Sequence, residues 1–338
     1  MPRTNASPQL TPRGEGGIAR LAHCWRWPAA ICALIIGSLQ LSLAPSEPLE
    51  PPELNSTVAE EPISPIPEPR PADPLKIKLG ERLFGDPRLS QDNSRSCSSC
   101  HDLSRNGASS KSQDVGLDGS SLPLNTPTIF NAALNFRFGW EGKLRSLESD
   151  GKAALENSQI MGASISELAE KLAADPGLRQ EFTAAYGSGP DSRNILDAIV
   201  SFERTLVTPD SRFDRWLTGD TAALSMEEQD GYRLFKSLGC VSCHQGVNIG
   251  GNLFERHGIF HPLASPNPEI LRVPSLRNVA TTAPYFHDGS TQTLDEAVRK
   301  MGLAQLNSTL TDQQVKAIVA YLQTLTGKYR GVPVGAAP

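Results

Sequence analysis

Apolar residues recur at spacings of three and four through most of the chain beyond residue 75, the pattern of helices with one buried face. The clearest example lies near the C-terminus, where one predicted face carries Val315, Ile318, Val319, Leu322 and Leu325. We interpret these side chains as core, with Gly327 as the expected helix stop. No alternating strand pattern of any length is present. The pattern predicts an all-α fold with long loops over 102–128 and 241–292.

Several of the expected helices also carry a recognisable start signal. A Ser or Thr is followed three residues later by Glu or Gln, as in a capping box. The pairs are Ser164 and Glu167, Ser225 and Glu228, Thr293 and Glu296, and Thr311 and Gln314. These pairs predict helix starts in both halves of the body.

The first 44 residues have the pattern of a targeting or anchoring segment. Residues 1–26 form a basic flank, and residues 27–44 follow without a single charged side chain. A basic flank before an apolar run keeps the N-terminus in the cytoplasm and sends the following chain across the membrane. Pro45 disfavours cleavage after Ala44, which favours an uncleaved anchor but leaves a cleaved signal peptide open.

Residues 45–74 are expected to form a disordered tether. They contain ten prolines and seven acidic residues against one arginine. Such a composition buries too little apolar surface to fold, and it extends in the polyproline II conformation.

The charge balance excludes one class of partner. The chain has 32 basic and 37 acidic residues, a net charge of −5, and the body beyond the tether is close to neutral. A near-neutral body offers no basic surface for a phosphate backbone, so no nucleic-acid partner is expected.

Two cysteine motifs indicate the cofactor. The chain reads Cys-Ser-Ser-Cys-His over 97–101 and Cys-Val-Ser-Cys-His over 240–244. In CxxCH the two thiols bond to the haem vinyl groups and the histidine ligates iron. The expected attachment residues are Cys97, Cys100, Cys240 and Cys243, and the expected iron ligands are His101 and His244. Each motif follows an apolar helical run, so the sequence predicts two cytochrome c-like helical domains, each around one covalent c-type haem.

The body resembles the bacterial di-haem cytochrome c peroxidase family over about 75–328. The resemblance is carried by three segments, Asp-Pro-Arg-Leu-Ser over 86–90, Asn-Thr-Pro-Thr over 125–128, and the block from 273 to 289. It implies a first domain over 75–210 with the peroxidatic haem and a second over 211–330 with the electron-transfer haem. Residues 331–338 are left as a tail.

The same resemblance implies further site residues. Met301 is expected as the sixth ligand of the second haem, since a thioether raises the potential of a His/Met haem. Trp140 aligns with a tryptophan that relays electrons between the haems. Asn125, Thr282 and Pro284 align with a calcium site between the lobes.

The chain departs from the family at the peroxide side of the first haem. Leu117 stands where many members have a distal histidine, which predicts a five-coordinate first haem. Ile160 stands at the position of the family's catalytic glutamate and Asp150 at that of its glutamine. Because peroxide reduction needs a proton carrier there, Asp150 and Gln159 are the candidate substitutes.

Three functions remain open at this point. The leading hypothesis is a periplasmic peroxidase that reduces H2O2 with electrons from a small cytochrome c or cupredoxin, and that residues 27–44 tether to the membrane if they are not cleaved. The electrons would enter at the second haem and pass through Trp140. The alternatives are a non-catalytic electron-transfer cytochrome or haem sensor, and an enzyme that oxidises side chains of a partner protein. Homodimers are common in the resembled family.

Overall fold

The structure, a computed structural model, describes residues 61–336. The expected basic flank and the apolar segment over 27–44 lie outside this range. None of the helices within the described part is long and apolar enough to cross a membrane. The fold is mostly helical, which confirms the predicted class.

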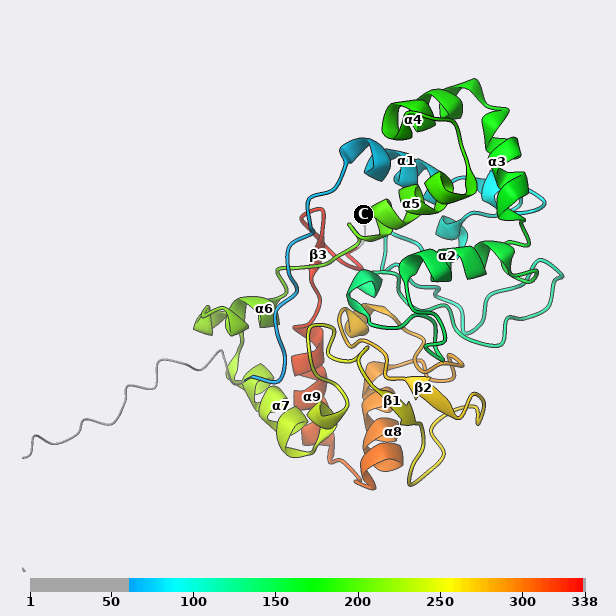
Figure 1. The fold of residues 1–338 in the computed structure, drawn as a ribbon. Coiled ribbons are helices and arrows are strands. Elements are labelled where there is room, and N and C mark those ends of the chain that lie inside the picture. The colour runs from blue at the N-terminus through cyan, green and yellow to red at the C-terminus, as the bar shows by residue number, and fades with distance from the viewer. Residues whose placement is uncertain (1–60, 337–338) are drawn as a thin grey trace, which may run out of the picture. The chain divides into compact units, whose positions relative to one another are not determined.

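The helices fall into two groups, which we call the first and second lobes (Figure 1). The helices of the first lobe are α1 (Pro74–Phe84), α2 (Leu147–Glu156), α3 (Ile165–Ala173), α4 (Pro176–Tyr186) and α5 (Ser192–Glu203). Those of the second are α6 (Arg212–Leu217), α7 (Met226–Ser237), α8 (Leu294–Leu306) and α9 (Asp312–Gln323). Each lobe has its own apolar core, so each is stabilised mainly by its own helices.

The helix-start signals work in most cases. Ser225 and Thr311 form complete capping boxes at α7 and α9, and the Thr293 hydroxyl accepts the Glu296 amide at α8. Ser164 precedes α3 but makes no capping hydrogen bond. The five apolar residues predicted for the last helical face, from Val315 to Leu325, are all buried.

The role expected for Gly327 was wrong. Helix α9 ends at Gln323, four residues earlier. A Cβ at Gly327 would lie 1.9 Å from the carbonyl oxygen of Thr208, so this glycine allows a close approach between two backbones.

A pair of crossing helices forms the centre of each lobe. In the first lobe α1 crosses α5 at Gly80, where an added Cβ would lie 1.9 Å from the carbonyl oxygen of Ala198. In the second lobe α7 crosses α9 at Gly231, where an added Cβ would lie 1.9 Å from the carbonyl oxygen of Ala317. Glycine at each crossing therefore lets two helices approach more closely than any side chain would permit.

The segment before α1 differs from the expected tether over 45–74. We call residues 61–66 the strap. Ile63 is 2% exposed and belongs to the core of the second lobe. The Glu61 carboxylate accepts a hydrogen bond of 2.5 Å from the Tyr232 hydroxyl. Apolar burial and a specific acceptor overcome the local composition, so this end of the proline-rich stretch is part of the folded body.

A hydrogen-bonded seam joins the lobes. The Asn131 side-chain amide donates to the Thr208 hydroxyl, and its oxygen accepts from the Thr208 backbone amide, both at 2.8 Å. The Asn278 side-chain amide donates to the same hydroxyl at 3.0 Å. Thr208 is fully buried. The chain between the lobes is thus held by one asparagine from each of them.

Two short antiparallel sheets were not predicted. Strands β1 (Phe254–Arg256) and β2 (Ile270–Arg272) pair with Phe254 opposite Arg272, and β3 (Lys328–Tyr329) pairs with β4 (Val332–Pro333). With two or three residues each, these strands are too short to show the alternation on which a sequence prediction depends.

Candidate functional site

Both CxxCH motifs adopt the same local structure. Cys97–Ser99 and Cys240–Ser242 are 3-10 turns, and the amide of the following histidine donates to the carbonyl of the first cysteine in each motif. The distances are 2.9 Å for His101 and 3.1 Å for His244. The tight turn therefore brings each histidine back over its own pair of cysteines.

The two histidines are prepared as metal ligands. Nδ1 of His101 lies 3.0 Å from the Gly107 carbonyl, and Nδ1 of His244 lies 3.2 Å from the Ile249 carbonyl. A donor bond from Nδ1 fixes the tautomer with a free Nε2. Burial lowers the pKa of both rings, for His244 to about 4, so the imidazoles are neutral as iron ligation requires.

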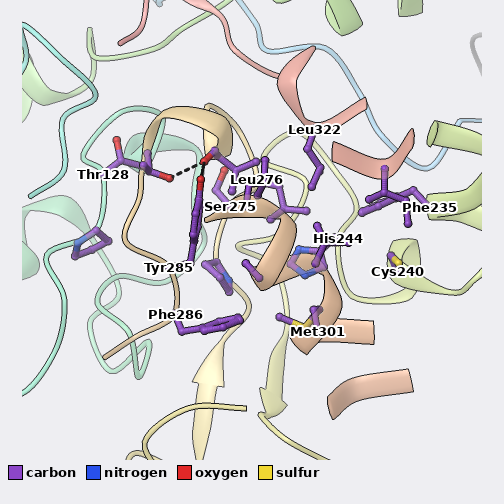
Figure 2. Close-up of a pocket in the computed structure, with 18 of the residues that line it drawn as sticks. Thr128, Phe235, Cys240, His244, Ser275, Leu276, Tyr285, Phe286, Met301 and Leu322 are labelled. Carbon is purple, nitrogen blue, oxygen red and sulfur yellow. Dashed lines mark hydrogen bonds between the residues drawn. The ribbon is translucent and has the colours of Figure 1, made fainter. Parts of the chain in front are cut away.

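A cavity of about 1320 Å³ of empty space, its mouth included, is lined mainly by second-lobe residues and also by first-lobe residues such as Asn125. We call it the second-lobe cavity. Cys240 and His244 of the CxxCH turn and Met301 of α8 line it, together with aliphatic and aromatic side chains such as Phe235 and Leu322 (Figure 2). A soft thioether and a neutral imidazole in an apolar cavity are the donor set of a His/Met haem. The residues present fit a covalent haem, and Met301 and His244 line the same cavity.

In the first lobe, Cys97 packs against the apolar cores. The Leu117 amide donates to the Gln159 carbonyl at 2.9 Å, which brings Leu117 beside Ile160. Both side chains are half-buried, and Ile160 packs against the core. The two positions where the sequence departs from the family are thus neighbours in the first lobe.

The two candidate proton carriers lie in different environments. Burial raises the pKa of Asp150 to about 6, and the positive charge of Arg272 opposes this shift. Gln159 lies close enough to the exposed Asp118 carboxylate to help lower the pKa of that group. Asp150 is therefore the carboxyl whose proton affinity suits exchange near neutral pH.

Trp140 lies where the lobes meet. Its indole N–H donates to the Asn125 carbonyl at 2.7 Å. Its ring is 6.2 Å from that of His287, and it also lines the second-lobe cavity. The position expected from the resemblance is thus one that contacts both lobes.

The residues expected at a calcium site are partly brought together. Asn125 and Thr282 line the same cavity, whereas Pro284 lies two residues beyond Thr282. The Asn125 amide nitrogen donates to the Lys111 and Ser112 carbonyls, which leaves its Oδ1 as an acceptor. Among the described residues no group of three or more His, Cys, Asp or Glu could hold a metal. The oxygen set, all neutral, fits a weakly bound hard cation.

Two buried charged residues were missed by the sequence analysis. Glu203 ends α5 at 9% exposure, and burial, reinforced by the charges of Asp150 and Glu148, raises its pKa to about 8. Arg272 is 7% exposed at the end of β2 and lines the cavity. The available signal was a charged residue inside an apolar run, Ser-Phe-Glu over 201–203 and Ile-Leu-Arg-Val over 270–273.

The fold and these sites define a two-lobed c-type cytochrome with a haem site in each lobe. A family model described as di-haem cytochrome c peroxidase matches residues 74–222, and a cytochrome c model matches residues 228–326. The chain is 41% identical to the cytochrome c551 peroxidase of Nitrosomonas europaea over 285 residues, covering 80% of this chain and 85% of that protein. It is 36% identical to the cytochrome c551 peroxidase of Pseudomonas aeruginosa over 321 residues, covering 87% of this chain and 92% of that protein.

A solved structure agrees with these relatives. The crystal structure of a MauG-like protein associated with microbial copper homeostasis has a TM-score of 0.69 at 30% identity, covering 78% of this chain and 94% of that one. The chain belongs to the di-haem cytochrome c peroxidase family. It is accordingly an oxidoreductase of the cytochrome c peroxidase type with two covalent c-type haems, as the sequence predicted.

Proposed function

We propose that this protein reduces hydrogen peroxide to water outside the cytoplasm, using electrons from a small cytochrome or cupredoxin. The bound haems supply the redox-active iron at which peroxide is reduced. The observation that carries the proposal is the contrast between the two sites, with Met301 in the second-lobe cavity and only Leu117 and Ile160 beside each other in the first. A site without a sixth protein ligand is open to a small substrate.

Electron transfer between the sites is assigned to Trp140. Its ring lines the second-lobe cavity, and its N–H is fixed on the first-lobe Asn125 carbonyl. An indole held from both sides keeps a constant position relative to the two cofactors, which supports a relay. Electrons from the donor protein would therefore enter through the second lobe.

Proton transfer is assigned to the Asp150 carboxylate. A peroxide molecule must lose a proton from one oxygen and gain one at the other as the O–O bond breaks. With a pKa of about 6, Asp150 accepts and returns a proton near neutral pH, which Ile160 cannot do. Glu203 is a second buried carboxyl, and the charge of Asp150 contributes to its raised pKa.

Three further assignments belong to this proposal. Asn125, Thr282 and Pro284 bind one Ca²⁺ between the lobes through oxygen atoms. Residues 27–44 export the chain to the periplasm and tether it if they are not cleaved. A second copy of the chain completes a homodimer, as the family resemblance implies.

A non-catalytic electron-transfer cytochrome is the second candidate. The aliphatic pair Leu117 and Ile160 favours it, because neither side chain assists peroxide chemistry. An enzyme that oxidises a partner protein is disfavoured by Met301, since the resembled enzymes of that type use a tyrosine at the second haem.

The test compares Asp150→Asn with wild type in the full-length di-haem protein, by following peroxide-dependent oxidation of a reduced small cytochrome c. The expected fall in kcat/KM for peroxide is about 10²–10⁴-fold. Wild-type activity should fall below about pH 6, where Asp150 is protonated and no longer accepts a proton, and this limb should vanish in the variant.

Asp118→Asn provides the control, since Asp118 is an exposed carboxylate near Gln159, and it should match wild type. An unchanged Asp150→Asn variant would exclude Asp150 as the proton carrier. Wild type that turns over no faster than free haem would exclude the peroxidase and leave the electron-transfer cytochrome.

A further inference from the structure

We propose that Arg272 binds a propionate carboxylate of the haem in the second-lobe cavity and in doing so fixes the turn that carries Trp140. Arg272 lies at the end of β2 and is 7% exposed. Its side chain lines the same cavity as His244 and Met301. It is the only Lys, Arg, Asp or Glu among the described residues that line this cavity.

The guanidinium of Arg272 is incompletely satisfied. Its Nε donates to the Gly139 carbonyl at 3.2 Å, but Nη1 is buried and finds no hydrogen-bond partner within 61–336. An unpaired buried charge is costly, so such a group is retained in proteins where a counter-ion or ligand completes it.

Arg277, five residues further on, shows what a self-sufficient buried arginine looks like in this fold. Its Nη1 donates to the Asp214 carboxylate at 2.8 Å, and its Nε and Nη2 donate to the Val247 and Ser64 carbonyls, each at 2.8 Å. The protein can therefore pair a buried guanidinium fully, and at Arg272 it does not.

The nearest anionic group does not fill this role. Asp150 is close enough to raise the pKa of Arg272, which burial lowers more strongly, but the two make no ion pair in the described structure. The guanidinium needs a stronger and closer anion.

A haem supplies that anion. Each haem carries two propionate carboxylates, and a planar guanidinium pairs with a carboxylate through parallel N–H bonds. The remaining side chains that line the cavity are apolar or uncharged polar, apart from the buried neutral His244. A propionate in this cavity therefore has one cationic partner among its described walls.

The same residue holds the relay turn. The Arg272 amide donates to the Trp140 carbonyl at 2.8 Å, while Nε holds the adjacent Gly139 carbonyl. A carboxylate bound to the guanidinium is then linked to the Trp140 backbone through one side chain. Arg272 is thus a positioning residue for Trp140, and this assignment depends on the two-haem family and not on the proposed peroxide chemistry.

The test is a potentiometric titration of the full-length di-haem protein as Arg272→Gln, followed at the absorption bands of each haem. Loss of the cation destabilises the added electron, so the ratio of reduced to oxidised second-lobe haem at fixed ambient potential should fall about tenfold, which is 59 mV for one electron. The freed propionate should also take up a proton when the haem is reduced. The potential of the second-lobe haem should therefore depend on pH in the variant, whereas the wild-type potential does not.

Arg272→Lys and Arg256→Gln make the result decisive. The lysine variant keeps the charge and should restore most of the potential without the pH dependence. Arg256 lies on the paired strand β1 with its side chain 67% exposed, so Arg256→Gln should leave both properties unchanged. If Arg272→Gln titrates like wild type, or if the first-lobe haem alone shifts, the assignment is wrong, whatever the peroxidase assay shows. If Arg272→Gln does not fold, the pH dependence of wild type decides: a second-lobe haem potential that is flat with pH supports the proposal, and one that falls with rising pH, as expected for an unpaired propionate, contradicts it.

Discussion

In both lobes an asparagine in the left-handed conformation opens a 3-10 turn, a single antiparallel bridge closes the loop that follows, and an α-helix begins three residues later. The matched residues, first lobe before second, are Asn131 and Asn278, Phe138 and Tyr285, Leu144 and Thr291, and Leu147 and Leu294. Every pair is 147 residues apart. The two lobes therefore repeat one structural plan well beyond their CxxCH motifs.

The equivalent positions carry different chemistry. Trp140 corresponds to His287, and the two rings meet 6.2 Å apart between the lobes. Met301 of α8 corresponds to Ala154 of α2. Only the methionine has an atom that ligates iron. Under the proposed function, a single duplicated scaffold thus provides a thioether for one site and none at the matching position of the other, which is the division of labour that electron entry and peroxide reduction require.

The largest effect is expected from erasing this difference with Met301→Ala, which gives the second lobe the residue that the first lobe has. Loss of the proposed thioether ligand should lower the potential of the second haem and reduce donor-dependent turnover by about 100-fold, or about 2.7 kcal/mol. Potentiometry and a steady-state assay measure the two effects. Met226→Ala, at a methionine that is 79% exposed, is the control. An unchanged potential in Met301→Ala would show that Met301 is a core residue.

The next effect tests whether the helix crossings are equivalent. Gly80→Ala and Gly231→Ala each place a Cβ 1.9 Å from a carbonyl oxygen of the facing helix, so each should lower the free energy of unfolding by about 2 kcal/mol. Gly189→Ala meets nothing within 4 Å and should be neutral. Denaturant unfolding followed by circular dichroism measures all three. A crossing variant as stable as Gly189→Ala would break the parallel between the lobes.

The smallest effect concerns a buried carboxyl that belongs to the first lobe. The Glu203 pKa is about 8 in the folded protein against an ordinary value near 4.5. The unfolded chain therefore loses this proton first, and the folded state becomes less stable as pH rises from 4.5 to 8.

At pH 8 the free energy of unfolding of Glu203→Gln should accordingly exceed that of wild type by on the order of 1–2 kcal/mol. At pH 4 this excess should be absent. Denaturant titrations at the two pH values measure the difference. A difference in the free energy of unfolding between variant and wild type that does not change with pH would mean that the pKa of Glu203 is not raised in the folded protein.

The local features of the sites could be predicted from the sequence, and the long-range ones could not. The motif from Cys97 to His101 predicts its own turn, because the hydrogen bond that closes the turn forms within these five residues. The strap was missed because the composition of 45–74 averages over Ile63, whose burial depends on a core some 150 residues away. Arg272 was missed because a sequence does not show which hydrogen-bond partners surround a side chain in the folded protein.

The most direct test of the central claim is stopped-flow absorption of the full-length di-haem protein mixed with H2O2, as isolated and after one-electron reduction. The account predicts that the haem of the first lobe is high-spin and that its spectrum changes within milliseconds at a rate proportional to peroxide, while the His/Met haem does not bind peroxide. A low-spin first haem, or one that reacts no faster than free haem, would contradict the account.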